Sequence, residues 1–187
     1  FEVFQKCKGG KINAYELFLA KTHELIKSEG INCQIFQNSF LADNSSRNLR
    51  DFYFKNETII SIDSFPERDN HKKRVFESVK MSVCILISKK LIKEDYPFQL
   101  RFWHDKYMES GYKTDYTVSE VFLFDPKQLI LPSLRNEEKN IFRNYYSITS
   151  KYSDYFDCLE GELNMTFHKK YMTSNSNYPL IVKGAQI

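Results

Sequence analysis

Residues 11–50 carry the pattern that constrains the fold most: a helical segment, a glycine, a strand and a second helical segment follow one another. Apolar residues recur at helical spacing in the first segment, and they are Ala14, Leu17, Phe18, Leu25 and Ile26. Gly30 suits the left-handed residue that ends such a helix, and residues 31–35 alternate apolar and polar side chains as a strand does. This order predicts the middle of an alternating α/β domain. Only residues 1–10 precede it, and they contain no phosphate-binding loop, so we expect a fragment of a larger protein.

Polar residues mark the starts of both helices. Asn13 and Glu16 predict a capping box, in which two side chains satisfy free backbone amides of the first turn. Asp43 or Ser45 can cap the second helix. The apolar residues carried by this second helix are Leu49, Phe52 and Tyr53.

Two further strands are expected before residue 90. Residues 58–63 are rich in β-branched side chains, and residues 79–88 form the apolar run of a buried strand. The polar segment between them, residues 66–74, leaves little room for a crossover helix, so these strands should pair antiparallel. The sheet would then hold three strands, with the middle one in sequence at an edge. Because a bare edge invites pairing, we expect the second part of the chain or another chain to cover it.

The chain changes character near residues 90–96, where we place a domain boundary. Beyond it aromatic residues increase, helical periodicity fades and turn residues become frequent. The elements expected there are a strand over residues 98–103, a helix capped by Thr117 and Glu120 and ending at Phe124, a helix capped by Asn136 and continuing through Tyr146, and strands over residues 159–167 and 180–183. Ile141, Phe142 and Tyr145 share one face of the later helix.

The composition is that of a folded protein of the cytoplasm. With 42% hydrophobic and 16% aromatic residues, the 187-residue chain can build a core. No apolar run approaches the roughly 18 residues that span a bilayer, so we expect no membrane partner. The cysteines lack the paired spacing of zinc ligands, which favours small core residues in a reducing compartment; they are Cys7, Cys33, Cys84 and Cys158. The histidines also lack metal-ligand spacing, and we expect surface or structural roles for His23, His71, His104 and His168.

Five cations crowd one aromatic residue in the loop before the third predicted strand. The cations are Arg68, Lys72, Lys73, Arg74 and Lys80, the ring is Phe76, and the acidic residues Glu67, Asp69 and Glu77 offset part of the charge. Such a loop suits nucleic acid, because lysines meet phosphates and the ring stacks on a base. A solvated loop with Phe76 in the core is the other interpretation, and composition alone favours it, since the net charge of the chain is only +3. Taken alone, the late segments that hold Lys169, Lys170 and Lys183 are surface turns.

Three stretches, taken in order, resemble a known family. They are GGKINAYELFLAKTHELIKSEGINCQIFQNSFL followed by LRDFYF, then RVFESVKMSVCILISKK, and finally GELNMTFHKKY with LIVKGAQI. Their order and spacing resemble the adenine-specific DNA methyltransferases of the gamma class. The similarity is greatest to large bacterial enzymes that fuse the methyltransferase to a target-recognition domain and in many cases carry a restriction nuclease.

The resemblance implies a mechanism and roles for particular residues. In this family the target adenine is flipped out of double-stranded DNA, an Asn-Pro-Pro-Tyr motif binds its amine, and S-adenosylmethionine supplies the methyl group. An aromatic residue after the valine of a Val-Phe pair stacks on the flipped base, and it maps to Phe76. The basic neighbours would then lie near the DNA backbone, and the DNA-binding residues implied are Arg68, Lys72, Lys73, Arg74, Lys80, Lys169, Lys170 and Lys183.

The departures from the family limit what this chain can do alone. It contains neither Asn-Pro-Pro-Tyr nor a cofactor-binding glycine loop, and Glu77 follows the pair where the family has proline or a polar residue. We therefore expect no catalytic, cofactor-binding or metal-binding residue here, and no bound S-adenosylmethionine. Residues 1–92 would be the C-terminal half of a Rossmann-like methyltransferase sheet, with the N-terminal half as a partner. Residues 93–187 would be a linker and the start of the target-recognition domain, a small α+β region.

Two other interpretations stay open at the level of sequence. A stand-alone, non-catalytic nucleic-acid-binding or interaction module would need no missing half. A methyltransferase-like component of a phage-defence system would share all of the features above.

Overall fold

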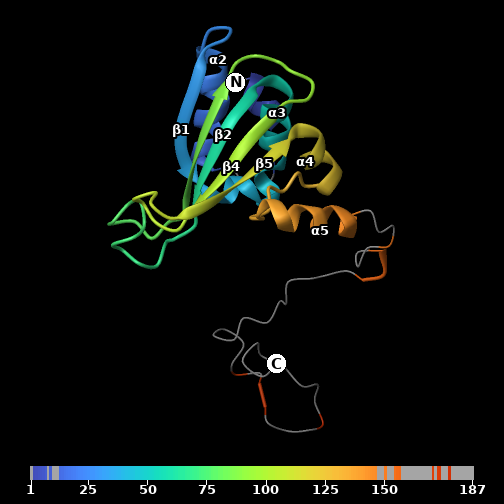
Figure 1. Cartoon of the computed structure of the whole chain (residues 1–187). Coiled ribbons are helices and arrows are strands. Elements are labelled where there is room, and N and C mark those ends of the chain that lie inside the picture. Colours follow the sequence, from blue (N-terminus) through green and yellow to red (C-terminus); the bar gives the residue numbers. More distant parts are fainter. Residues whose placement is uncertain are drawn as a thin grey trace. The chain divides into compact units, whose positions relative to one another are not determined.

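The structure, a computed structural model, describes residues 2–7, 9, 13–146, 150, 154–156, 170, 172–173 and 177. Residues 1–148 form one compact unit and residues 149–187 form a second. The helices and strands of the described residues all belong to the first unit (Figure 1). The strands predicted over residues 159–167 and 180–183 lie outside the described residues.

Five strands form one mixed sheet in the order β1-β3-β2-β4-β5. The strands are β1 (Ile31–Gln37), β2 (Thr58–Phe65), β3 (Val83–Lys89), β4 (Pro97–Trp103) and β5 (Gly111–Thr117). β3 runs antiparallel to both β1 and β2, as predicted. β4 runs parallel to β2, and β5 runs antiparallel to β4. The unit is therefore α/β, but its sheet has five strands where three were expected.

β2 lies inside the sheet, so the prediction that it forms an edge is wrong. Residues 61–64 of β2 pair with residues 99–102 of β4. The companion prediction, that the second part of the chain or another chain covers this strand, is confirmed, because β4 of the second part pairs with it. The predicted border after residue 92 consequently does not separate two compact units. The assignment of residues 93–187 to a target-recognition region stays a prediction.

Five α-helices accompany the sheet: α1 (Glu2–Cys7), α2 (Ala14–Leu25), α3 (Arg47–Asn56), α4 (Val118–Phe124) and α5 (Asn136–Tyr146), the count being that of the described residues. Short 3-10 turns at Asn38–Leu41 and Asn44–Ser46 connect β1 to α3. The predicted capping box of α4 is present, because Thr117 Oγ1 accepts from the Glu120 amide at 3.2 Å and Glu120 accepts from the Thr117 amide at 3.0 Å. α1 and β5 were not predicted.

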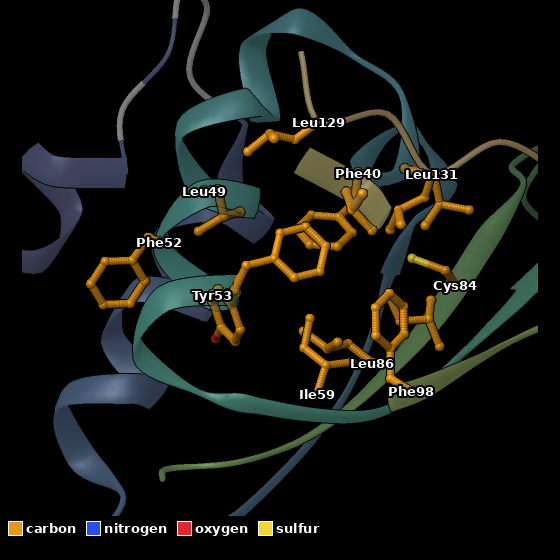
Figure 2. Close-up of a cluster of buried hydrophobic side chains, with 14 of the residues drawn as sticks. Phe40, Leu49, Phe52, Tyr53, Ile59, Cys84, Leu86, Phe98, Leu129 and Leu131 are labelled. Atoms are coloured by element: carbon orange, nitrogen blue, oxygen red, sulfur yellow. The ribbon is translucent and has the colours of Figure 1, made fainter. Parts of the chain in front are cut away.

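The core lies between the helices and one face of the sheet. Figure 2 shows side chains of α3 and of the strands meeting there. Tyr53 is fully buried, and its hydroxyl donates to the Leu19 carbonyl oxygen at 3.0 Å. Phe54 of α3 packs on Phe98 of β4 with ring centroids 5.9 Å apart, and Phe98 stacks in turn on Tyr116 of β5. The core therefore runs from α2 to β5 without a break.

Arg50 ties the two parts of the chain together. Its buried guanidinium donates to the carbonyl oxygens of Phe40 at 2.6 Å and Gln128 at 2.7 Å. Burial lowers the pKa of this guanidinium to about 10. Because a buried charge is costly unless its hydrogen bonds are made, these carbonyl groups fix the loop around Gln128 against α3.

α2 departs from the predicted pattern at both ends and along its face. Asn13 is the N-cap residue, but its side chain makes no capping hydrogen bond. Glu16 is instead buried and accepts from Ser46 Oγ at 3.3 Å. The buried face consists of Glu16, Leu19 and Ala20, whereas the predicted stripe leaves Leu17, Phe18 and Leu25 exposed. Periodicity identified the apolar residues, but most of their side chains lie on the exposed side of the helix.

The turn after α2 uses its glycine differently from the prediction. The helix ends at Leu25, and Glu29, not Gly30, takes the left-handed conformation, with φ of 60°. A Cβ atom at Gly30 would lie 2.9 Å from the Lys27 carbonyl oxygen. Glycine is therefore required there for a close backbone approach rather than for a left-handed turn.

Other predictions hold for some of their residues and not for others. α5 covers the predicted range, but on its predicted apolar face only Phe142 packs inward, while Ile141 and Tyr145 are exposed. Cys7 and Cys84 are buried as expected, Cys33 is exposed, and Cys158 lies outside the described residues. The second helix buries Leu49, Phe52 and Tyr53 as predicted; its start is displaced to Arg47 by the preceding 3-10 turn, whose N-cap is Asp43.

Candidate nucleic-acid interface

The basic loop, residues 66–82, connects β2 to β3. It lies at the end of the sheet where β1, β2 and β4 have their C-terminal residues. In α/β proteins, ligands bind in the crevice at the carboxyl ends of the strands. Figure 1 shows this loop projecting beyond the sheet beside the loop that joins β4 to β5. The sequence thus places its most basic segment at the end of the sheet that such proteins use for function.

Side chains within the basic loop hold its backbone in place. Glu67 accepts hydrogen bonds from the backbone amides of Asn70 at 3.0 Å and Asp69 at 2.8 Å, and these bonds lower the pKa of its carboxyl group. The Arg74 guanidinium donates to the carbonyl oxygens of Arg68 at 3.0 Å and Glu77 at 3.1 Å. Arg74 therefore stabilises the backbone of the loop, and its guanidinium already uses donors for bonds within the loop.

The predicted cations differ in how much of their charge is compensated. Asp69 accepts a hydrogen bond from Lys80 at 2.7 Å, which lowers the pKa of Asp69, and it lies 3.8 Å from Arg68. Lys72 and Lys73 are exposed, and neither has an ion-pair partner in the described part of the chain. The loop therefore offers two uncompensated ammonium groups at neighbouring positions.

Phe76 lies on the surface of this loop, not in the core. Its exposed fraction is 42%, and Val79 three residues later is exposed to the same degree. The preceding residue, Val75, is partly buried. The structure therefore contradicts the interpretation that composition favoured, in which Phe76 was a core residue, and leaves the ring accessible to a ligand.

A second loop, residues 104–110 between β4 and β5, is attached to the basic loop. The Lys106 amide donates to the Lys73 carbonyl oxygen at 2.8 Å, and Lys106 Nζ pairs with Glu77 Oε1 at 2.5 Å. This ion pair lowers the pKa of Glu77. The sequence led to no predicted role for this loop. Tyr107 and Met108, two adjacent apolar residues between the charged Lys106 and Glu109, were a signal that could have indicated one, and both are exposed in the structure.

The remaining predicted DNA contacts lie in the second compact unit or outside the described residues. Lys170 is exposed and belongs to the second compact unit, whereas Lys169 and Lys183 lie outside the described residues. The five cations of the loop and Phe76 are thus the part of the predicted site that the structure brings together.

The histidine His23 has a structural environment. Its Nδ1 lies 2.7 Å from Glu57 Oε1, its ring meets Phe52 edge to face at 4.8 Å, and the other Glu57 oxygen accepts from Ser88 Oγ. Glu57 and Ser88 are fully buried. This cluster joins α2, α3 and β3. Among the described residues there is no group of three or more potential metal ligands.

Gly9 does not belong to a glycine cradle for S-adenosylmethionine. Gly9, which belongs to the only glycine pair in the sequence, packs so closely that a Cβ atom would lie 2.3 Å from the Ser45 carbonyl oxygen. That glycine therefore serves backbone packing, and the cofactor does not fit at this position.

Comparison with known proteins connects the first part of the chain to DNA modification enzymes. Residues 2–71 match the family model of the Eco57I restriction-modification methylases. No curated protein matches the sequence. None of the described helices is long and apolar enough to cross a membrane.

Two solved structures are similar to part of this chain. One is the type IIG restriction endonuclease BpuSI, with a TM-score of 0.43 and 17% identity over 74% of this chain and 16% of that chain. The other, from Vibrio vulnificus YJ016, is assigned as the modification subunit of a type I restriction enzyme, with a TM-score of 0.38 and 13% identity over 74% of this chain and 29% of that chain. The chain therefore spans less than a third of either protein.

Proposed function

We propose that this chain is part of an adenine-specific DNA methyltransferase of a restriction-modification system. The match of residues 2–71 to the restriction-modification methylases supports the enzyme class. The observation that carries the proposal is the accessible ring of Phe76 on a braced basic loop at the carboxyl ends of the strands. An aromatic face beside ammonium groups suits a DNA base next to its phosphates.

In this proposal the chain supplies the stacking side of the base pocket. Phe76 stacks on the flipped adenine, and Lys72 and Lys73 contact the phosphates of double-stranded DNA. The catalytic tetrapeptide and the S-adenosylmethionine site belong to another part of the methyltransferase, since this sequence contains neither motif. The chain alone then binds DNA without transferring a methyl group.

The edge of β1 supports the existence of such a complementary part. Ile31 and Ile35 of β1 are 66% and 44% exposed, and no described strand pairs with the outer side of β1. Ile35 faces Ile85 of β3 on the same side of the sheet. A stand-alone binding module would have no use for an apolar strand edge, whereas the other half of a methyltransferase sheet would continue from it.

The test is Phe76→Ala in the methyltransferase assembled from this chain and its catalytic part. We expect the methylation rate to fall about tenfold or more, because stacking on a base contributes about 1–3 kcal/mol. Binding to fully paired DNA should change little, because the base is stacked only after it has flipped. The matched control is Val79→Ala, which truncates another exposed apolar side chain of the same loop. Unchanged methylation kinetics in a folded Phe76→Ala enzyme would remove Phe76 from the pocket.

The contribution of the lysines is tested separately in the chain itself. Duplex binding should weaken as salt rises, because each phosphate contact releases counterions. Replacing Lys72 and Lys73 by alanine should reduce both the affinity and its salt slope. The control replaces Lys80, whose charge is compensated by Asp69, and should have the smaller effect. Binding that does not depend on salt would contradict a role for this loop.

A further inference from the structure

The loop between β4 and β5 is an ordered turn, although it carries exposed apolar side chains. The Tyr107 amide donates to Asp105 Oδ1 at 3.0 Å, and the His104 amide donates to the Ser110 carbonyl oxygen at 3.1 Å. Met108 takes the left-handed conformation, with φ of 59°, which non-glycine residues rarely adopt. These contacts hold the tip of the turn in one conformation.

The tip presents an aromatic ring to solvent. Tyr107 is 60% exposed and Met108 is 51% exposed. An exposed aromatic ring offers a face on which an unpaired base can stack. Lys106 Nζ lies 5.5 Å from the centre of the Tyr107 ring, so a cation supports this ring from one side.

The turn is joined to the basic loop through Lys106. Its backbone amide bonds to the Lys73 carbonyl oxygen, and its ammonium group pairs with Glu77, the neighbour of Phe76. The charge of Lys106 is thereby compensated, so its role is to position the turn. The turn that carries Tyr107 is thus bonded to the loop that carries Phe76 and the free ammonium groups of Lys72 and Lys73.

We propose that Tyr107 is a second base-stacking residue. It contacts the DNA base of the opposite strand that is left without a partner when the adenine flips out. This inference rests on the proposed function and adds a residue to it. Aromatic rings near cations form stacking platforms for unpaired bases. A base whose pairing partner has flipped out is such an unpaired base, and its ring face is available to an aromatic side chain. The uncompensated charge next to this turn is that of Lys72 and Lys73, which suits the phosphates of DNA, while Asp105 and Glu109 flank Tyr107 with the opposite sign.

The experiment compares two short duplexes in binding to the whole chain. One duplex is fully paired, and the other has an abasic site in place of the adenine, which leaves the opposite thymine without a partner. Fluorescence anisotropy measures the affinity of the wild-type chain, of Tyr107→Ala and of the control Tyr145→Ala, which truncates an exposed tyrosine on α5. We expect Tyr107→Ala to bind the abasic duplex about tenfold more weakly than wild type and the paired duplex almost equally well. Tyr145→Ala should match the wild type on both.

Two further variants separate the ring from the fold. Tyr107→Phe keeps the ring and should keep the wild-type affinity, whereas Tyr107→Leu keeps an apolar side chain and should lose as much as Tyr107→Ala. If every Tyr107 variant binds both duplexes like wild type while the double replacement of Lys72 and Lys73 weakens binding, the role of Tyr107 is refuted and the proposed function stands. If the wild-type chain binds neither duplex, both are refuted.

Discussion

The two outer strands of the sheet, β5 and β1, differ in whether other described residues cover their outer sides. The outer side of β5 is covered by α5: the Asp115 amide donates to Asn136 Oδ1 at 3.2 Å, and Lys139 Nζ donates to the Asp115 carbonyl oxygen. Lys139 also pairs with Glu120 of α4 at 2.8 Å and lies 4.8 Å from the centre of the Tyr116 ring. The sheet therefore ends at β5.

β1 has no such cover in the described part of the chain, and its surroundings are apolar. Ile31 and Ile35 are exposed on the strand, and Phe18 and Leu25 are exposed on α2. α2 lies over β1, because Gln34 donates to Thr22 Oγ1, and Phe18 and Leu25 flank Thr22 at helical spacing. The comparison shows that α5, through the charged side chain of Lys139, ends the sheet at β5. β1 has no such cover among the described residues and is suited to pairing with a further strand.

The largest expected effect concerns the covered edge. Lys139→Ala removes the ammonium group that joins Asp115, Glu120 and the Tyr116 ring, and it leaves a largely buried carboxylate with the half-exposed Arg143 as its remaining ion-pair partner. We expect the free energy of unfolding to fall by about 3 kcal/mol, measured by urea denaturation. The control Lys113→Ala removes an exposed lysine of β5 itself and should cost less than about 0.5 kcal/mol. Equal effects of the two variants would mean that α5 does not secure this edge.

The next effect concerns the open edge. Ile35→Lys places a charge on β1, a substitution that blocks strand pairing at sheet edges. We expect the isolated wild-type chain to self-associate as its concentration rises, and Ile35→Lys to weaken this association about tenfold, or about 1.4 kcal/mol. Sedimentation velocity over a concentration series measures it. Ile60→Lys, an exposed position on the interior strand β2, is the control and should leave association unchanged. A wild-type chain that stays monomeric throughout would contradict the view of β1 as a pairing edge.

Sequence patterns predicted the covered edge only in part. The capping box of α4 follows from a local rule, since Thr117 and Glu120 act within one turn of helix. The extent of α5 was also predicted, but Asn136 is its first residue rather than its cap, and its side chain accepts from the Asp115 amide of β5. β5 was missed because its inward residues, Tyr112, Thr114 and Tyr116, alternate with charged ones but are not a hydrophobic run. Its antiparallel neighbour β4 was predicted as a strand, but the parallel pairing of β4 with β2 joins distant segments and is not encoded by local periodicity.

The candidate site shows the same limit. The crowding of cations around Phe76 is visible in the sequence, and the accessible position of that ring agrees with the role implied by resemblance. Sequence could not show that Arg74 is occupied by backbone carbonyl groups or that Lys80 is paired with Asp69. Nor could it bring Tyr107 beside this loop, because the bond between Lys106 and Lys73 depends on the complete sheet.

The smallest expected effect returns to the covered edge and depends on pH. Burial alone would raise the pKa of Glu120, but hydrogen bonds from Lys139 and the Thr117 amide, with the charge of Lys139, outweigh it and lower the pKa below 4.5. A carboxylate with a depressed pKa stabilises the fold above its unfolded pKa, and the contribution is lost as pH falls through the folded pKa. Glu120→Gln keeps an acceptor for the capping box and removes the charge, so it should cost about 1 kcal/mol at neutral pH.

The difference between Glu120→Gln and wild type should then shrink below about pH 4.5 and vanish once the wild-type carboxyl is protonated. Urea denaturation at a series of pH values measures this, with Glu137→Gln on the exposed first turn of α5 as the matched control, which should show no such dependence. A difference that stayed constant down to the acid limit would mean that the Glu120 charge does not hold α5 on β5. In that case the covered edge would be secured by the packing of Phe142 on Phe124, whose ring centroids lie 5.6 Å apart, and the contrast between β5 and β1 would be one of shape rather than of charge.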